Sequence, residues 1–161
     1  MDVEPFDLNE ATREVIALLS GELERNRVIL KQEFSDRLPP VNGDRVQLQQ
    51  VILNLVRNAS DAMSSIEDRP RKIVLRTELE GEHVGLSVQD SGVGFTPEVA
   101  GQMFESFYTT KPDGMGVGLS VSRSIIEANH GRLWATANDG PGATFAFSIP
   151  CEHGSQPRVG P

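Results

Sequence analysis

Hydrophobic residues follow a helical period in some segments of the chain and alternate with polar residues in others. The helical period, with capping residues at the segment starts, predicts helices at residues 8–24, 45–65, 96–104 and 116–129. Alternation predicts strands at residues 27–34, 73–80, 83–90, 132–138 and 143–149. This order of elements predicts an α+β fold, a two-layer α/β sandwich in which helices cover one face of a mixed sheet.

Each long helix has an apolar face that we expect to lie in the core. On the first helix, which Asp7 caps, the expected inward residues are Val15, Leu18, Leu19 and Leu23. On the second, which Asp44 caps, they are Leu48, Val51, Ile52, Leu55, Val56 and Ala59. On the helix at residues 116–129, they are Val117, Val121, Ile125 and Ile126.

Length and composition fit one domain. The chain has 161 residues, 38% of them hydrophobic and 24% charged, and its apolar runs fall short of the roughly 20 residues of a membrane span. We expect a cytoplasmic domain at residues 1–150 and a disordered tail at 151–161. The single cysteine, Cys151, excludes an internal disulfide. The net charge of −8 argues against nonspecific binding of nucleic acid and means that any phosphate site must be neutralised locally.

Two amide side chains interrupt the apolar stripe of the second helix. Asn54 and Asn58 are four positions apart, so they project from one helix face. One interpretation is that a carboxamide oxygen ligates Mg²⁺, an ion that prefers hard oxygen ligands and is bridged by substrate phosphates. The alternative is that both amides cap nearby backbone. Asp61 is either an exposed residue or a partner of the phosphate region.

An aspartate and two glycine clusters indicate a nucleotide site. Asp90 ends an alternating strand, where its carboxylate can accept a hydrogen bond from the exocyclic amine of adenine, whereas guanine has a carbonyl at that position. The alternative role for Asp90 is to cap the turn that follows. Glycines let backbone approach a ligand closely, and amides at a helix start attract phosphate oxygens. The glycines concerned are Gly92, Gly94, Gly114, Gly116 and Gly118.

Residues 105–114 have no convincing period, contain proline and glycine, and are predicted to form a mobile loop. Phe104 and Phe107 either belong to the core or anchor this loop as it closes over a nucleotide. Lys111 is then a candidate for reaching phosphate. Arg57 is a second candidate base for neutralising phosphate charge.

Four motifs, in this order, resemble the N, G1, F and G2 boxes of sensor histidine kinases. They are Asn54-x-x-x-Asn58, Asp90-x-Gly92-x-Gly94, Phe104-x-x-Phe107-x-x-x-Lys111 and Gly114-x-Gly116-x-Gly118-Leu119. The segments Asn129-His130-Gly131 and Gly142-Ala143-Thr144-Phe145 resemble two further motifs of that domain. The resemblance covers residues 5–150. It implies the Bergerat fold of gyrase B, the ninety-kilodalton heat-shock chaperone and the mismatch-repair ATPases, with a mostly antiparallel sheet and a flexible ATP lid.

The resemblance implies that ATP and Mg²⁺ bind between the long helix and the lid. By position, Asn58 is the Mg²⁺ ligand with Asn54 beside it, Asp90 binds adenine, and the glycines shape pocket and lid. Leu119 is the last residue of the fourth motif and is included among the nucleotide-binding residues.

Two positions depart from the family pattern. Gly131 is followed by Arg132, where the family often has a second glycine. Ala143 stands where many members have threonine or serine near adenine, which leaves Thr144 as the substitute.

The chain has no His-Glu phosphoacceptor box. The resemblance therefore implies two partners, a histidine-bearing pair of dimerisation helices and a response regulator. We expect the helix pair to precede residue 1 and the fragment alone to be monomeric. Asn54 favours a kinase, because the ATPase relatives place a glutamate there to polarise water. The alternatives are an anti-sigma-type serine kinase of the same fold and a module that binds adenine nucleotide without phosphoryl transfer.

Overall fold

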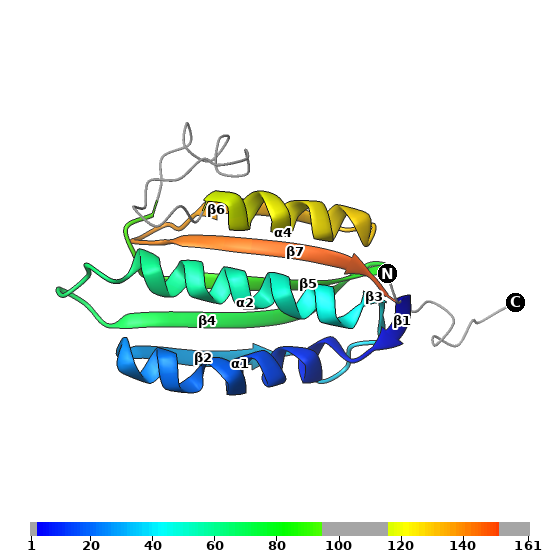
Figure 1. Ribbon diagram of the computed structural model, residues 1–161, viewed down its shortest axis with the longest axis horizontal. Coiled ribbons are helices and arrows are strands. Elements are labelled where there is room, and N and C mark those ends of the chain that lie inside the picture. Colours follow the sequence, from blue (N-terminus) through cyan, green and yellow to red (C-terminus); the bar gives the residue numbers. More distant parts are fainter. Residues whose placement is uncertain (1–2, 95–115, 152–161) are drawn as a thin grey trace, which may run out of the picture.

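The computed structural model describes residues 3–94 and 116–151. Three helices in these ranges lie side by side on one face of a five-stranded sheet (Figure 1). They are α1 (Leu8–Arg25), α2 (Arg45–Ala62) and α4 (Gly116–Ala128). The two-layer sandwich is therefore confirmed. The predicted helix at 96–104, the loop at 105–114 and residues 152–161 lie outside the described residues.

The large sheet has the strand order β2-β4-β5-β7-β6. Its strands are β2 (Val28–Phe34), β4 (Arg71–Glu80), β5 (His83–Asp90), β6 (Arg132–Ala137) and β7 (Ala143–Pro150). β2 and β4 are parallel, since α2 lies between them in the chain and provides the long crossover that a parallel pair requires. The other three pairings are antiparallel, so the sheet is mixed and mostly antiparallel, as expected.

A second, two-stranded sheet was not predicted. It pairs β1 (Val3–Phe6) with β3 (Val41–Asp44), and both strands are four residues long. Segments this short show too little alternation to be recognised. Cys151, predicted to lie in the disordered tail, instead forms a bridge with Val41 and is buried, with 5% of its surface exposed.

The buried face of α2 follows the prediction, since all six expected inward residues are buried. Asp7 and Asp44 cap their helices as predicted, accepting hydrogen bonds from the backbone N–H groups of Glu10 and Gln47. Two expected core residues were wrong: Leu18 on α1 and Val121 on α4 are 77% and 45% exposed. Each precedes a buried residue by one position, and that step of about 100° turns it out of the narrow contact stripe.

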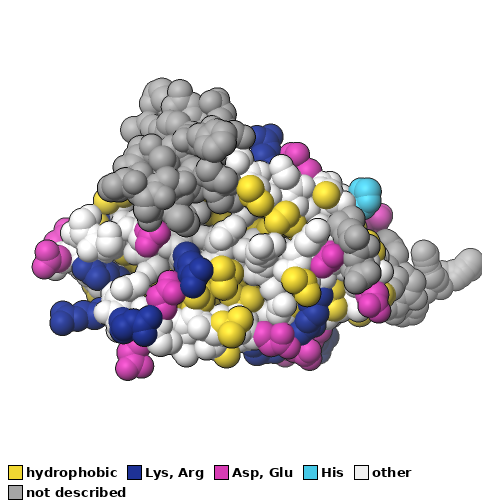
Figure 2. Space-filling model, in the orientation of Figure 1, with side chains coloured by type: hydrophobic (Ala, Val, Ile, Leu, Met, Phe, Trp, Pro, Cys, Tyr) yellow, Lys and Arg dark blue, Asp and Glu magenta, His cyan; other side chains and the backbone are white. Residues whose placement is uncertain are grey.

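The face that carries the helices has charged side chains of both signs interspersed with exposed hydrophobic ones (Figure 2). On this face the acidic side chains are scattered among basic ones and do not form one broad acidic surface. Among the described helices, none is long and apolar enough to cross a membrane.

His130 ends α4 in a left-handed conformation, with φ of 66°. The N–H groups of His130 and Gly131 donate to the carbonyls of Glu127 and Ile126, which is the Schellman arrangement. A residue with a Cβ pays about 1–2 kcal/mol to adopt this conformation, and glycine avoids that cost. Glycine also loses more conformational entropy on folding, which offsets part of the stabilisation.

His130→Gly is therefore expected to stabilise the domain by about 0.5–1 kcal/mol and to raise its melting temperature by roughly 1–4 °C. Circular dichroism melting of the variant and of His130→Ala checks this, because alanine keeps the strained Cβ and should give no gain. A lower melting temperature for the glycine variant would contradict the strain argument.

Candidate nucleotide site

Asp90 is the buried acid at the end of β5, with 3% of its surface exposed. Its Oδ1 accepts hydrogen bonds from the backbone N–H groups of Gly92 at 2.8 Å and Ala143 at 3.3 Å. Asp90 therefore does cap the turn, as the alternative interpretation held. These two bonds also fix the orientation of the carboxylate.

The loop after Asp90 lies directly against the last turn of α2. The N–H of Val93 donates to the carbonyl of Ala62 at 3.2 Å. At Gly92, an added Cβ would lie 2.5 Å from that same carbonyl oxygen, so only glycine allows this approach. Gly94 follows with φ of 72°. The first glycine cluster is thus attached to the end of α2.

The two asparagines of α2 lie near this junction. Asn58 is one turn before Ala62 and is buried, with 6% of its surface exposed. Asn54, one turn earlier, is half-buried and donates through Nδ2 to the hydroxyl of Ser122 on α4, at 3.3 Å. The structure therefore brings Asn58 and Asp90 to the same end of the molecule, on the side of the sheet that carries the helices.

The start of α4 lies at this end too. Ser122 contacts Asn54, and Asn129 contacts Gln47, so α2 and α4 are antiparallel. The N-terminus of α4, where Gly116 and Gly118 lie, is therefore beside the C-terminal half of α2. The N–H groups at a helix N-terminus favour anions. Leu119 packs in the core instead, 9% exposed.

The side chains of two predicted site residues point away from Asp90 and Asn58. Arg57 faces α1, where its guanidinium forms two hydrogen bonds with the carboxylate of Glu22 at 3.1 and 3.2 Å. Thr144 pairs with Gln89 across the strands, so it points to the sheet face opposite Asp90, and its hydroxyl donates to Asn138 at 2.7 Å. The structure thus supports neither as a ligand contact.

Four other predicted residues, Phe104, Phe107, Lys111 and Gly114, lie outside the described residues.

Two residues that support the site were missed by sequence reasoning. Asn138 donates from Nδ2 to the carbonyl of Asp90 at 2.9 Å. Arg69 donates to the carbonyls of Ser91 and Gly92 at 2.8 and 2.9 Å. The Asn-Asp-Gly-Pro-Gly turn after β6 was a signal for Asn138, since asparagine bonds to nearby backbone in turns. Nothing in the local sequence signals this role of Arg69, since the two carbonyls that it contacts are more than 20 residues away.

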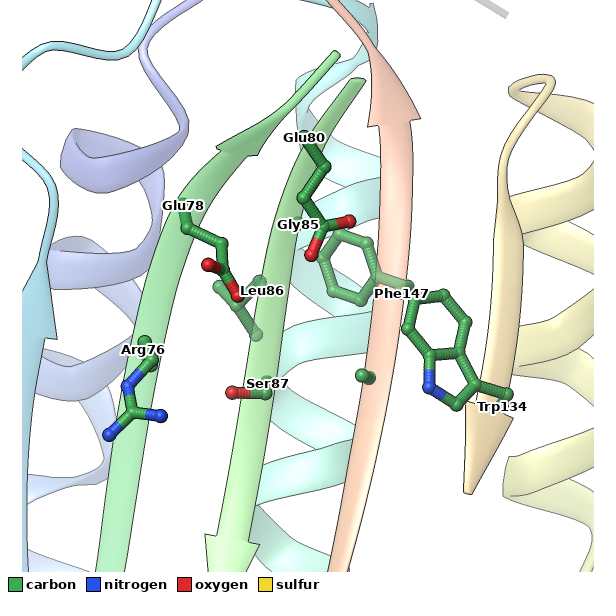
Figure 3. A pocket seen from close by; sticks show the side chains of 9 residues that line it. Arg76, Glu78, Glu80, Gly85, Leu86, Ser87, Trp134 and Phe147 are labelled. Atoms are coloured by element: carbon green, nitrogen blue, oxygen red, sulfur yellow. The ribbon is translucent and has the colours of Figure 1, made fainter. Parts of the chain in front are cut away.

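A pocket on the other side of the sheet is separate from this site. Figure 3 shows Arg76, Glu78, Glu80 and Trp134 projecting from the sheet on the side away from the helices. The guanidinium of Arg76 donates a hydrogen bond to the carboxylate of Glu33 on β2 at 2.6 Å. This bond, and to a smaller extent one from Lys31, holds the pKa of Glu33 below its ordinary value. The pocket does not include Asp90 or either asparagine of α2.

The comparisons with known proteins identify the family of the chain. Residues 43–153 match the family described as "Histidine kinase-, DNA gyrase B-, and HSP90-like ATPase". The chain belongs to this ATPase family.

Among solved structures, the catalytic domain of histidine kinase ThkA superposes with a TM-score of 0.83 at 34% identity, covering 94% of this chain and 97% of that one. The complex of ThkA with the response regulator protein TrrA matches with a TM-score of 0.80 at 31% identity, covering 96% of this chain and 43% of that chain. Within the ATPase family, the chain is thus a catalytic, nucleotide-binding domain of the sensor histidine kinase type.

Two full-length relatives are sensor proteins. The chain is 46% identical over 132 residues to FixL of Bradyrhizobium diazoefficiens, covering 82% of this chain and 26% of FixL. It is 34% identical over 148 residues to TdiS of Thauera aromatica, covering 91% of this chain and 27% of TdiS. The chain thus spans about a quarter of the length of these relatives.

Proposed function

We propose that this domain binds Mg-ATP between the C-terminal half of α2, the end of β5 and the start of α4, and transfers the γ-phosphoryl group to a histidine. The observation that carries the proposal is the junction of Asp90, the glycine loop and the last turn of α2, one turn from Asn58. An acid that can distinguish adenine and an amide that can ligate a cation thus share one end of the fold.

Within this proposal Asp90 accepts a hydrogen bond from the adenine amine. Asn58 and Asn54 would hold Mg²⁺ through their carboxamide oxygens, a fit supported by their spacing and by the preference of Mg²⁺ for hard oxygen donors. Both amides are neutral, so the phosphates supply the charge that holds the ion. When bound, the ion neutralises and orients the phosphates. Phe104, Phe107, Lys111 and Gly114 remain the predicted lid of this site.

The amide at Asn54 favours transfer over hydrolysis. A glutamate at this position of the helix could polarise an attacking water, and an amide cannot act as a base. A neutral imidazole is already a good nucleophile, so an enzyme that phosphorylates histidine needs to position the groups and neutralise charge. A serine kinase needs a base for its hydroxyl acceptor, and an amide at position 54 is not one.

The acceptor belongs to partners. We propose a histidine on a pair of dimerisation helices of the same kinase, and then an aspartate of a response regulator, with the reaction taking place in the cytoplasm. The ThkA complex supports a response regulator as a partner, since it is the complex of a similar kinase. The 161-residue chain by itself is proposed to be a monomer.

The test is phosphoryl transfer between separate fragments. This chain, Mg²⁺ and γ-labelled ATP are mixed with the histidine-bearing helix pair of its full-length kinase. The expected product is an acid-labile, base-stable label on the helix pair, the behaviour of phosphohistidine. Acid-stable label on serine, or release of free phosphate alone, would overturn the proposal in favour of a serine kinase or an ATPase.

Asn58→Ala is expected to weaken ATP binding roughly 10- to 100-fold in Mg²⁺, the scale on which altered metal sites lose affinity, and to leave binding in EDTA nearly unchanged. Calorimetric titration under both conditions measures this. Gln50→Ala, an exposed residue of the same helix, is the matched control and should change neither value. An equal loss with and without metal would contradict the ligand role of Asn58.

A further inference from the structure

The packing face of α4, continued by Asn129 just after its last residue, contains two polar residues among apolar ones. Leu119, Ser122, Ile126 and Asn129 are all buried, and Ser122 is fully so, with 0% of its surface exposed. Each polar residue meets a polar partner on α2. Ser122 accepts a hydrogen bond from Asn54, and Asn129 donates one to Gln47 at 3.2 Å.

These two contacts have different characters. Asn129 also bonds to backbone, accepting from the N–H of Asp44 at 2.9 Å and donating to the carbonyl of Ile125 at 2.8 Å. It therefore fixes the end of α4 against the start of α2, a role in folding. Ser122 instead bonds a side chain, and that side chain is Asn54 of the candidate metal site.

A serine is a costly choice at this position if packing were all that mattered. Alanine is a better helix former and fills nearly the same volume, while a buried hydroxyl must be compensated by hydrogen bonds. The structure gives the Ser122 hydroxyl such a hydrogen bond, with Asn54, and alanine could not make it.

In the structure Asn54 is the donor of this hydrogen bond, so its amide nitrogen faces Ser122. A carboxamide is planar, with its two donors on nitrogen and its acceptor oxygen on the other side. With Nδ2 on Ser122, Oδ1 is the atom left for another partner. If the group could rotate freely, it would present NH₂ to a cation part of the time, and NH₂ cannot ligate Mg²⁺.

We propose that Ser122 is a positioning residue that holds the carboxamide of Asn54 with its oxygen toward the Mg-phosphate group. The inference rests on the proposed function, because the orientation of Asn54 matters only if Asn54 takes part in that site. It also connects the helix that begins with the second glycine cluster to the asparagine pair of α2.

The test compares Ser122→Ala, Ser122→Thr and Ser124→Ala in the 161-residue chain. Ser124 is exposed on the same helix and is the matched control. ATP affinity is measured by calorimetry in Mg²⁺ and in EDTA, with a melting curve for each variant. Ser122→Ala is expected to reduce the gain in affinity that Mg²⁺ provides by roughly tenfold, the scale seen when a residue that orients a metal ligand is lost.

The controls separate positioning from structure. Ser122→Thr keeps the hydroxyl and should retain most of the gain from Mg²⁺, and Ser124→Ala should retain all of it. If Ser122→Thr lowers the melting temperature by more than Ser122→Ala does, the threonine result is set aside. The test then rests on comparing the affinities of Ser122→Ala and Ser124→Ala. Equal losses of affinity with and without Mg²⁺ in Ser122→Ala would overturn the inference, since they would indicate a general packing defect.

Asn54→Ala distinguishes failure of the inference from failure of the proposed function. If Asn54→Ala and Asn58→Ala both keep the full gain from Mg²⁺, the proposed metal site is wrong, and if Asn54→Ala alone keeps it, the inference falls while the role of Asn58 stands. If Asn54→Ala loses it and Ser122→Ala behaves like Ser124→Ala, the site stands and the positioning role is wrong. The double variant Asn54→Ala/Ser122→Ala should be no weaker than Asn54→Ala, because Ser122 acts through Asn54. Additive losses would also overturn the inference.

Discussion

Asp90→Asn is expected to weaken ATP binding roughly 100-fold or more, because the site would then present an N–H₂ group where adenine also has a donor. The fold should survive the change. The side chain keeps its shape, and its remaining oxygen can still accept from the N–H groups of Gly92 and Ala143. Calorimetry with ATP, together with thermal melting, measures both effects.

Asparagine separates these effects more cleanly than alanine does. Asp90→Ala would leave the two backbone donors without their acceptor, at about 1–3 kcal/mol for each buried group, and so would confuse loss of binding with loss of stability. Gln89→Ala is the control, since Gln89 is exposed and neighbours Asp90 on the opposite face of the sheet. Unchanged ATP affinity in a folded Asp90→Asn protein would remove Asp90 from adenine recognition.

Most of the fold could be predicted because its larger elements bury one face each. The six-residue stripe of α2 is a local pattern, and local patterns are visible in a sequence. The pair of β1 with β3 and the burial of Cys151 depend on contacts between distant segments, which leave no periodic signal. The exposed positions of Leu18 and Val121 depend on how wide a stripe each helix buries, which is set by its neighbours.

The candidate site was predictable where residue type and chemistry coincide. Asp90 and Asn58 are polar residues in apolar surroundings, which is unusual enough to be informative. Arg57 was misplaced because a one-position step along a helix turns a side chain toward another neighbour, here Glu22 of α1.

Thr144 could have been excluded from the sequence. If residues 143–149 form a strand, Ala143 and Thr144 must face opposite sides of the sheet. That Thr144 follows Ala143 in the chain therefore does not indicate that its side chain lies near adenine.

Gly142→Ala is expected to affect both stability and nucleotide binding. Gly142 has φ of 94°, and a Cβ there would lie 2.0 Å from the carbonyl oxygen of Asp90. Strain of this kind combined with a backbone clash costs about 3 kcal/mol or more, which corresponds to a fall in melting temperature of roughly 6–12 °C for a domain of this size. Thermal melting measures it.

The same turn contains the control for this prediction. At Gly140, an added Cβ would meet no atom within 4 Å, so Gly140→Ala should leave both stability and ATP affinity nearly unchanged. In the Gly142 variant, relief of the clash must move the backbone of Asp90, whose carboxylate is fixed by the N–H of Ala143 next door. ATP affinity should therefore fall even at temperatures where the variant remains folded. If Gly142→Ala melts early but binds ATP normally below its transition, the turn supports the fold alone, and the backbone at Asp90 has more freedom than its hydrogen bonds imply.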